Sequence, residues 1–436
     1  MNRFFYSTLF YLATPALLGR LWWRSRRAPD YRQRWRERFA LYDNPAVEQP
    51  VDIMFHAVSV GEVHATVPLI RQLQAHHPAL KILVTTTTPT GSARVTALLA
   101  DSVQHVYLPY DMPGPINRFL DRFAPRLVVI METEWWPNLI HSCQRRNIRL
   151  LLANARLSEK SQKNYGAIKG LARTMLEQFD AITAQSDEDS HRLQALGASP
   201  NKIEVAGSMK YDMPLHRDQL AQARTDKQGL AGRPVMIAAS TRVLDGDSED
   251  EKVLAAFRQV LAANPQTLLI LVPRHPERFD SVAALAGKAG FRVARRSRDS
   301  LPLADDHVFI GDSMGEMHYY LGLSDLAFVG GSLVNTGCQN IIEPAAMGLP
   351  VITGPSRFNF QAVSDGLVAA GGQQIVADVD ELATTVNALL ADPARRHAMG
   401  DAAARAVQAN QGATARNLGI INRLLEAPPV ADASAG

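Results

Sequence analysis

Cysteine is almost absent from this chain of 436 residues, which contains only Cys143 and Cys338. Two cysteines cannot build a disulfide framework, so the composition is typical of a protein from a reduced compartment. Neither cysteine has metal-ligating neighbours in the sequence, and we therefore expect no metal site. A repeat of solenoid length is also lacking, which argues against a repeat architecture. The length instead predicts two or three domains, each with a sizeable core.

Excess charge is lacking over most of the chain, because the net charge of +3 arises at one end. Residues 1–38 hold nine arginines against Asp30 and Glu37, a net charge of +7, which leaves −4 for all other residues. The basic character is thus a property of the N-terminal segment and not of the globular body. We expect no nucleic acid among the partners.

A long, uncharged hydrophobic run is also lacking, although residues 4–23 come close to one. This segment is apolar and aromatic, but proline, glycine and arginine interrupt it, and a membrane-spanning helix needs about 20 apolar residues. It has no small-residue cleavage site, so we do not expect a secretory signal peptide. Trp22, Trp23 and the nearby arginines are typical of an interfacial anchor beside anionic lipids. We expect a membrane anchor with the body in the cytosol; a helix packed on the protein itself is the alternative.

Short apolar runs alternate with helical stretches from residue 51 onward, which is the pattern of βαβ units in a parallel sheet. The predicted strands of the first half are 51–55, 81–86, 103–108, 126–131, 149–153, 181–184 and 203–206. Those of the second half are 234–239, 267–272, 291–294, 307–310, 326–329 and 350–353, and helical sequence then runs from 380 to 426. We predict an α/β protein with two doubly wound Rossmann-like domains facing a central cleft, where ligands bind at the carboxyl ends of the strands.

The polar segment 216–233 separates the two halves and is predicted to be a linker. The full division is an anchor at 1–38, an N-terminal Rossmann-like domain at 39–215, the linker, a C-terminal Rossmann-like domain with terminal helices at 234–426, and a tail at 427–436. The tail has too few apolar side chains to fold.

Candidate reactive groups follow the strands of the first domain. Glu62 could be a general base that helix-end N–H groups keep ionised, but Ser59-x-x-Glu62 also fits a capping box in which the carboxylate only binds a backbone N–H. Glu132 and Glu134 end a strand beside two tryptophans, whose faces could stack on sugar rings, and a period of two puts both acids on one side. Lys210 could stabilise charge on a leaving phosphate, or it could be a solvated loop residue.

A glycine turn at 330–332 follows strand 326–329 in the second domain and leads into a predicted helix. A strand, a glycine loop and a helix N-terminus offer free backbone N–H groups to a phosphate. Glu343, one turn into the helix, could accept hydrogen bonds from a ribose diol; an acid favoured there by the helix dipole is the alternative. Arg274 could clamp a phosphate, and the loop 311–317 opens a further helix.

These motifs occur in a fixed order along the chain, at 56–62, 132–138, 154–158, 207–212, 273–278, 314–316 and 340–344. With them the sequence resembles the lipopolysaccharide Kdo transferases (3-deoxy-D-manno-octulosonic acid transferases), which are glycosyltransferases of the GT-B fold. The resemblance extends over nearly the whole chain, including the N-terminal anchor.

The resemblance implies that Glu62 is the proton acceptor and that Glu132 and Lys210 stabilise the transition state. It implies that the CMP part of CMP-Kdo is bound by Pro273, Arg274, Met314, Gly315, Glu316, Asn340, Ile341, Ile342 and Glu343. The acceptor would be the lipid A precursor (lipid IVA), and the transfer would invert the anomeric centre without a metal or a cofactor. The enzyme would work in lipopolysaccharide core biosynthesis on the cytoplasmic side of the cell inner membrane, among its lipids.

One segment departs from the family pattern, which has Ala-Ser-Thr, then His or Arg, and shortly afterwards Gly-Glu. The loop 242–251 is longer and more acidic here, so the acid that replaces the family glutamate is left open. Three alternatives also stay open: a nucleotide-sugar 2-epimerase of the same architecture, a non-catalytic membrane glycolipid-binding protein, and a retaining hydrolase that uses Glu132 and Glu134. The sequence does not fix the number of Kdo residues added, the oligomeric state, or whether the anchor spans the bilayer.

Overall fold

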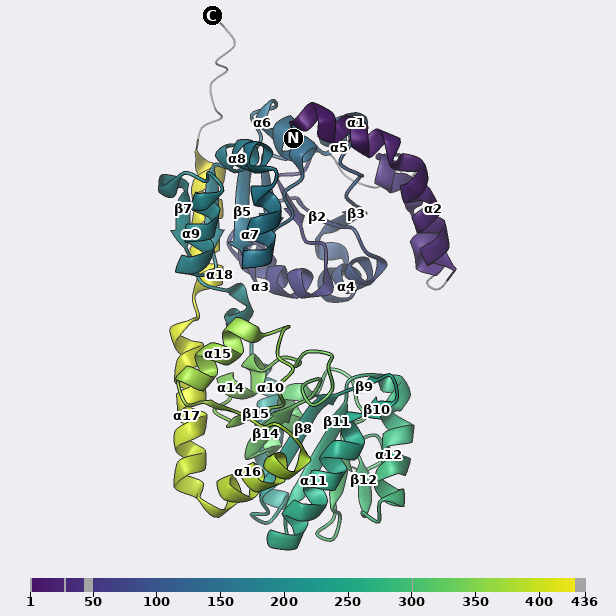
Figure 1. The fold of residues 1–436 in the computed structure, drawn as a ribbon, viewed down its shortest axis with the longest axis vertical. Helices are drawn as coiled ribbons and strands as arrows, with labels where there is room; N and C mark the ends of the chain where they lie inside the picture. The colour runs from purple at the N-terminus through teal and green to yellow at the C-terminus, as the bar shows by residue number, and fades with distance from the viewer. Residues whose placement is uncertain (1, 27–28, 43–49, 300, 428–436) are drawn as a thin grey trace, which may run out of the picture. The chain divides into compact units, whose positions relative to one another are not determined.

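The computed structural model describes residues 2–26, 29–42, 50–299 and 301–427 (Figure 1). The chain forms two compact units: unit 1 consists of Met1–Met213 with Gln411–Gly436, and unit 2 consists of Pro214–Asn410. Each unit contains a seven-stranded sheet whose paired strands are parallel. The prediction of two Rossmann-like α/β domains is therefore confirmed. The predicted tail lies outside the described residues, except for Ala427.

The sheet of unit 1 has the strand order β3-β2-β1-β4-β5-β6-β7. Its strands are β1 (Ile53–His56), β2 (Ile82–Thr86), β3 (Gln104–Tyr107), β4 (Leu127–Met131), β5 (Arg149–Ala155), β6 (Ala181–Ala184) and β7 (Ile203–Val205). The helices of unit 1 are α1 (Arg3–Leu12), α2 (Thr14–Ser25), α3 (Val60–His76), α4 (Pro89–Leu99), α5 (Pro113–Phe123), α6 (Pro137–Gln144), α7 (Glu159–Gly166), α8 (Lys169–Glu177), α9 (Asp187–Ala195) and α18 (Ala413–Glu426). All seven strands lie within two residues of their predicted bounds.

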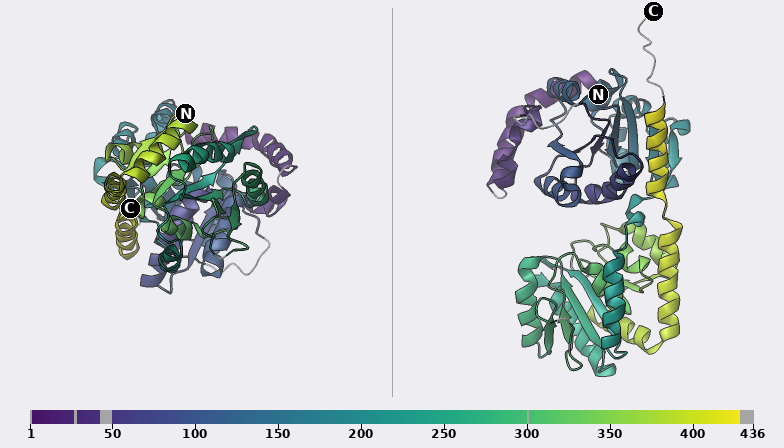
Figure 2. Two further views of the ribbon diagram at one scale, coloured as in Figure 1. Left: turned by 90° about the horizontal axis from the view of Figure 1, so that it is seen from below. Right: turned by 180° about the vertical axis from the view of Figure 1, so that it is seen from behind.

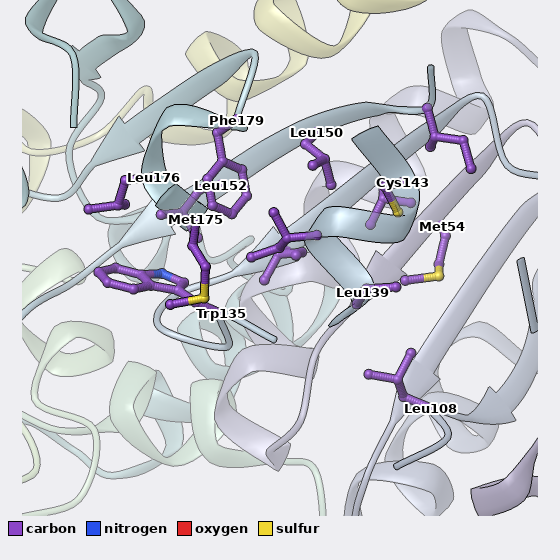
Figure 3. Packing of buried hydrophobic residues seen from close by; sticks show 14 of the residues in the cluster. Met54, Leu108, Trp135, Leu139, Cys143, Leu150, Leu152, Met175, Leu176 and Phe179 are labelled. Carbon is purple, nitrogen blue, oxygen red and sulfur yellow. The ribbon is translucent and has the colours of Figure 1, made fainter. Parts of the chain in front are cut away.

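Helices cover both faces of this sheet, which explains why its strands read as continuous apolar runs (Figure 1). Alternate strand residues point to opposite faces, so Met54 and Ile53 belong to different hydrophobic clusters. The Met54 cluster includes side chains of α5, α6 and α8, and Figure 3 shows part of it, including Met54, Leu139, Leu150 and Phe179. The Ile53 cluster includes side chains of α3, α4 and α18.

Helix α18 belongs to unit 1, although the sequence predicted it as part of the C-terminal domain (Figure 2). It buries Ile420 and Ile421 in the Ile53 cluster and packs against α3. The Asp212 carboxylate accepts the backbone N–H groups of Gly412 at 2.7 Å and Thr414 at 2.5 Å, and so caps the start of the helix. The apolar face of α18 was visible in the sequence, but the unit against which it packs was not.

The sheet of unit 2 has the strand order β12-β13-β11-β8-β14-β15-β16. Its strands are β8 (Val235–Thr241), β11 (Leu268–Pro273), β12 (Val293–Arg295), β13 (Val308–Ile310), β14 (Leu326–Val329), β15 (Val351–Thr353) and β16 (Gln373–Ile375), and β9 (Val243–Leu244) pairs with β10 (Asp247–Ser248) in a separate hairpin. The helices are α10 (Arg217–Gly229), α11 (Glu249–Ala263), α12 (Phe279–Lys288), α13 (Met317–Leu323), α14 (Ile342–Ala346), α15 (Gln361–Ala369), α16 (Val379–Ala391) and α17 (Pro393–Ala409). Strand β16 was not predicted, because two glutamines open it.

The segment 216–233 is not the linker that the sequence predicted, because most of it forms helix α10 (Figure 1), and this helix packs against α13. Ala223 of α10 is fully buried. A Cβ atom added at Gly322 of α13 would lie 2.7 Å from the Ala223 Cβ, so the two helices meet through small side chains. Because this contact uses small side chains, the rest of α10 is mostly polar, and the polar sequence therefore looked like a linker.

The N-terminal segment forms two helices, with α1 ending at Leu12 and α2 beginning at Thr14. Within the described part of the chain, none of the helices combines the length and the apolar character that crossing a membrane requires. The two helices leave several large apolar side chains exposed: Phe4, Phe5, Leu9, Leu12, Trp22 and Trp23. Ser7 of α1 is buried against α6, so one face of this helix packs on the protein, as the alternative interpretation proposed.

Candidate functional site

Glu62 lies in the first turn of α3, directly after the carboxyl end of β1. Its carboxylate accepts the Val58 N–H at 2.9 Å and the Ser59 hydroxyl at 2.8 Å, and the Glu62 N–H donates back to the Ser59 oxygen at 3.3 Å. The capping interaction that the sequence offered as an alternative is therefore present. It also fixes the carboxylate at the carboxyl edge of the sheet, so capping and a chemical role are compatible.

The pKa of the Glu62 carboxyl is raised above its ordinary value, chiefly because the group is buried. The hydrogen bonds from Val58 and Ser59 act in the opposite direction, and the nearby Glu132 charge raises the pKa further. The sequence-based expectation that helix-end N–H groups keep Glu62 ionised considered only contributions that lower the pKa, and burial outweighs them. A carboxylate whose pKa moves towards neutrality is a stronger base once it is ionised.

Glu132 and Lys210 come together at the same edge, with 3.9 Å between the Lys210 Nζ and a Glu132 carboxylate oxygen. Glu132 follows β4 and adopts the left-handed conformation, with φ of 54°, so Glu134 lies after a turn and not in an extended strand. The predicted period of two does not apply to this pair. Burial first, and then the charges of Glu62 and Glu132, raise the pKa of Glu134 to about 7. Three carboxyl groups thus influence one another beside the Lys210 ammonium.

Asn154 explains how Lys210 is held in this position, a role that its place in the sequence did not indicate. Its side-chain oxygen accepts the Met209 N–H at 3.1 Å, and its own N–H donates to the Thr183 hydroxyl at 2.9 Å. Asn154 adopts a φ of 54°, a conformation that asparagine tolerates better than most residues. The end of β5 therefore positions the loop that carries Lys210.

Trp135 does not offer a free ring face for a sugar, contrary to the sequence-based expectation. It is 5% exposed and its ring stacks on Tyr165, with 4.5 Å between the ring centroids. Figure 3 shows it among the core side chains Met175 and Leu176. Trp136 is half-buried and stays a candidate for contact with a sugar.

In unit 2 the glycine turn does not present free N–H groups, which corrects the prediction of an open phosphate cradle. The buried Glu249 carboxylate accepts the N–H groups of Gly331 at 2.6 Å, Ser332 at 3.0 Å and Leu333 at 2.9 Å. It also accepts the Arg242 N–H at 3.1 Å. Glu249 is therefore the acid of the lengthened 242–251 loop that ties this loop to the glycine turn.

The helix that follows the glycine turn is also shorter than predicted. Helix α14 has five residues, and Asn340 Oδ1 accepts the N–H of its first residue, Ile342, at 3.0 Å. Glu343 is the second residue of this helix and not one turn into it. Burial raises the pKa of the half-buried Glu343 to about 7. The side chains of Ile341 and Ile342 are buried, so only their backbone could contact a nucleotide.

The other predicted donor-binding residues lie at the carboxyl ends of adjacent strands of this sheet. Pro273 ends β11, and Arg274 is exposed, with its Nε 3.3 Å from the Gln339 side-chain oxygen. Met314 and Gly315 follow β13 and are exposed. Glu316 binds the Arg296 guanidinium at 3.0 Å, and this contact helps to hold the pKa of Glu316 below its ordinary value.

The structure thus gathers the nine predicted donor residues at one edge of the unit 2 sheet, because β13, β11, β8 and β14 are successive neighbours. Gln339 and Glu249 join them, and neither was in the predicted set. Among the described residues, no group of three or more histidine, cysteine, aspartate or glutamate side chains is placed to hold a metal ion.

Comparison with known proteins finds matches in both units. Residues 33–213 match the family model described as 3-Deoxy-D-manno-octulosonic-acid transferase (kdotransferase), and residues 240–406 match that of Glycosyl transferases group 1. The 3-deoxy-D-manno-octulosonic acid transferase of Haemophilus influenzae is 44% identical over 98% of this chain and 99% of its own length. This chain belongs to the 3-deoxy-D-manno-octulosonic acid transferase family. The predicted resemblance is confirmed, and the Kdo transferase family is one of glycosyltransferases.

Two further relatives give the breadth of the likeness. The enzyme of the same name from Bordetella pertussis is 40% identical over 84% of this chain and 86% of its own length. A putative UDP-N-acetylglucosamine 2-epimerase from Listeria monocytogenes, known from its crystal structure, has a TM-score of 0.56 with 15% identity, covering 86% of this chain and 96% of that chain. At that identity the epimerase shares the fold with this Kdo transferase family member, and nothing about its substrate follows.

Proposed function

We propose that this protein moves a Kdo residue from CMP-Kdo to the lipid A precursor, with inversion at the anomeric carbon, in lipopolysaccharide core biosynthesis. The observation that carries the proposal is the buried Glu62 carboxylate beside the Glu132–Lys210 pair, in a chain that belongs to the Kdo transferase family. The names of the relatives support Kdo as the sugar that is transferred. The lipid acceptor and the inversion at the anomeric carbon are inferred from the family resemblance.

In the proposed reaction Glu62 accepts the proton of an acceptor hydroxyl while the hydroxyl oxygen attacks the anomeric carbon. The bond between that carbon and the phosphate oxygen breaks, and CMP leaves with the electron pair. A single in-line displacement turns the anomeric centre over. The Lys210 ammonium lies beside Glu132, in the loop that Asn154 of β5 holds through the Met209 N–H, and it stabilises the negative charge that develops during transfer. Neither step uses a metal or a cofactor.

The CMP moiety is proposed to bind at the carboxyl edge of the unit 2 sheet. Arg274 is exposed there and its planar guanidinium suits a phosphate. Glu343 and the backbone of 340–342 are proposed to contact the nucleoside. The glycine turn serves this site indirectly, because Glu249 occupies its N–H groups and fixes its shape.

The lipid acceptor is proposed to be reached at the cytoplasmic surface of the inner membrane. The exposed apolar side chains of α1 and α2, together with the arginines of residues 1–38, favour an interfacial anchor over a spanning one. Each cationic side chain near an anionic surface contributes about 1 kcal/mol. Phe4→Ser with Phe5→Ser should reduce recovery on anionic vesicles, because the exposed apolar rings would no longer enter the lipid surface. Equal recovery of variant and parent protein would refute the anchor.

The test of the function is whether CMP release depends on both substrates. The purified full chain is incubated with CMP-Kdo and lipid A precursor in detergent, and the lipid product is analysed by mass spectrometry. We expect CMP release only when the lipid is present, with a matching gain of Kdo mass on the lipid. Release of free Kdo or an altered nucleotide sugar without lipid would favour a hydrolase or an epimerase, and binding without CMP release would favour a non-catalytic protein.

A further inference from the structure

Asn138 is a fully buried polar residue in the first turn of α6, and none of the roles described so far uses it. Its side-chain oxygen accepts a hydrogen bond from the Arg3 guanidinium at 3.1 Å and lies 3.0 Å from the Ser7 hydroxyl. Its side-chain amide donates to the backbone oxygen of Asp111 at 2.7 Å. One side chain thus joins helix α1, helix α6 and the loop after β3.

Asp111 fixes the same helix end from the other side. Its carboxylate accepts the N–H of Asn138 at 2.9 Å and of Leu139 at 2.8 Å, so it caps α6 although it lies outside that helix. Burial raises the pKa of Asp111 to about 6, against the effect of these two N–H groups. A buried carboxyl group with two backbone partners defines the position of the helix start closely.

The start of α6 is also one end of the loop 132–136, which carries Glu132 and Glu134. The other end of this loop is β4, where the Glu132 N–H donates to the Ala153 oxygen of β5 at 3.0 Å. A short loop with both ends fixed has little freedom. A shift of the α6 start would therefore move the carboxylates of Glu132 and Glu134 with respect to Lys210 and Glu62.

We propose that Asn138 and Asp111 are positioning residues that hold the 132–136 loop in its reactive geometry, and that helix α1 completes this assembly through Arg3 and Ser7. Helix α1 then has two functions on two faces. Phe4 and Phe5 lie exposed on one, while Ser7 is buried against α6 on the other. The inference rests on the proposed function, because it assumes that the 132–136 loop takes part in transfer.

The chain offers a matched pair of hydroxyls for the test. Ser7 and Thr8 are neighbours in α1, and each hydroxyl also lies close to a backbone oxygen one turn earlier, at 2.9 Å for Ser7 and 3.1 Å for Thr8. Only the Ser7 hydroxyl also reaches Asn138. We expect Ser7→Ala to lower kcat about three- to fivefold, the equivalent of most of one hydrogen bond, and Thr8→Ala to leave kcat unchanged.

The assay uses the full chain with CMP-Kdo and detergent-solubilised acceptor, so that membrane recovery plays no part. KM for CMP-Kdo should stay unchanged in Ser7→Ala, because the proposed donor-binding residues lie in unit 2. A general loss of folded protein would instead appear as a smaller folded fraction in circular dichroism. Asn138→Ala should have the larger effect, about tenfold or more on kcat, since small misplacements of reacting groups are costly. Phe4→Ser with Phe5→Ser should lower recovery on vesicles and leave kcat in detergent unchanged.

An unchanged kcat in Ser7→Ala, or an equal loss in Thr8→Ala, would overturn the inference. A smaller folded fraction with an unchanged kcat per folded molecule would show that the contacts serve stability alone, and this also overturns it. Failure of the proposed function looks different, because the parent protein itself would then show no lipid-dependent CMP release. If Asn138→Ala does not fold, the comparison of kcat between Ser7→Ala and Thr8→Ala tests the positioning role.

Discussion

Removal of the Glu249 carboxylate should loosen the glycine turn of unit 2 more than any other single truncation in the 242–251 loop. The carboxylate is fully buried and accepts four backbone N–H groups, those of Arg242, Gly331, Ser332 and Leu333. Glu249→Ala leaves these donors without a partner. A buried donor that loses its partner costs about 1 to 3 kcal/mol.

The four donors together place the expected loss at about 4 kcal/mol or more if the turn does not rearrange. The free energy of unfolding of a domain is about 5 to 15 kcal/mol. Unit 2 should therefore approach instability, or the turn should open locally and admit water to its N–H groups. Asp247→Ala is the control, because Asp247 lies in the same 242–251 loop and its side chain is 53% exposed in an ion pair with Lys252.

Hydrogen exchange read by mass spectrometry on peptides that cover residues 329–335 measures this directly. Glu249→Ala should raise the exchange rate of these amides by orders of magnitude and weaken CMP binding, while Asp247→Ala changes neither. Unchanged exchange in Glu249→Ala would refute the view that this carboxylate holds the turn. Thermal unfolding alone is a poorer measure, since a chain of two units need not unfold in two states.

Two further changes test other parts of the structure. Ala223→Leu should lower the stability of unit 2 by about 1 to 3 kcal/mol in denaturant unfolding, because the larger side chain meets α13 at Gly322; a linker at 216–233 would tolerate it. Burial raises the pKa of Glu134 from 4.5 to about 7, so the folded state keeps a proton that the unfolded state releases in this window. The stability contributed by that proton is present below pH 4.5 and is lost as the pH rises through about 7, so Glu134→Gln should gain stability over the parent by up to about 3 kcal/mol at pH 8 and by little at pH 4. Equal pH profiles would contradict the burial argument.

The sequence predicted the sheets well because the strands are buried on both faces, and such strands stand out as apolar runs bounded by turns. The positions of Glu62, Glu132 and Lys210 followed from this, since parallel strands bring their carboxyl ends to one edge. Helix α10 was missed because its contact with α13 is made by Ala223 and Gly322, which carry almost no hydrophobic signal. The unit to which α18 belongs depends on a packing partner far away in the sequence.

The fine structure of the two edges was less accessible to sequence reasoning. The glycine turn looked open because its partner, Glu249, lies about 80 residues earlier in a loop of unusual length. Trp135 looked like a sugar platform because a tryptophan at a strand end does not reveal which way its ring turns, and here the ring packs on Tyr165. Tertiary contacts between distant segments decided both cases.

Kdo transfer by Glu62→Gln is the measurement that bears most directly on the proposed chemistry. The amide oxygen of the introduced glutamine can still accept the Val58 N–H, and its amide nitrogen can donate to the Ser59 hydroxyl oxygen, so the capping contact persists while the base is lost. We expect transfer to fall by about 10² to 10⁴, as for other losses of a general base, with CMP binding intact and Glu159→Gln, another first-turn acid of unit 1, fully active. Transfer at the parent rate in Glu62→Gln would contradict the account, because Glu62 would then be a capping residue and no more.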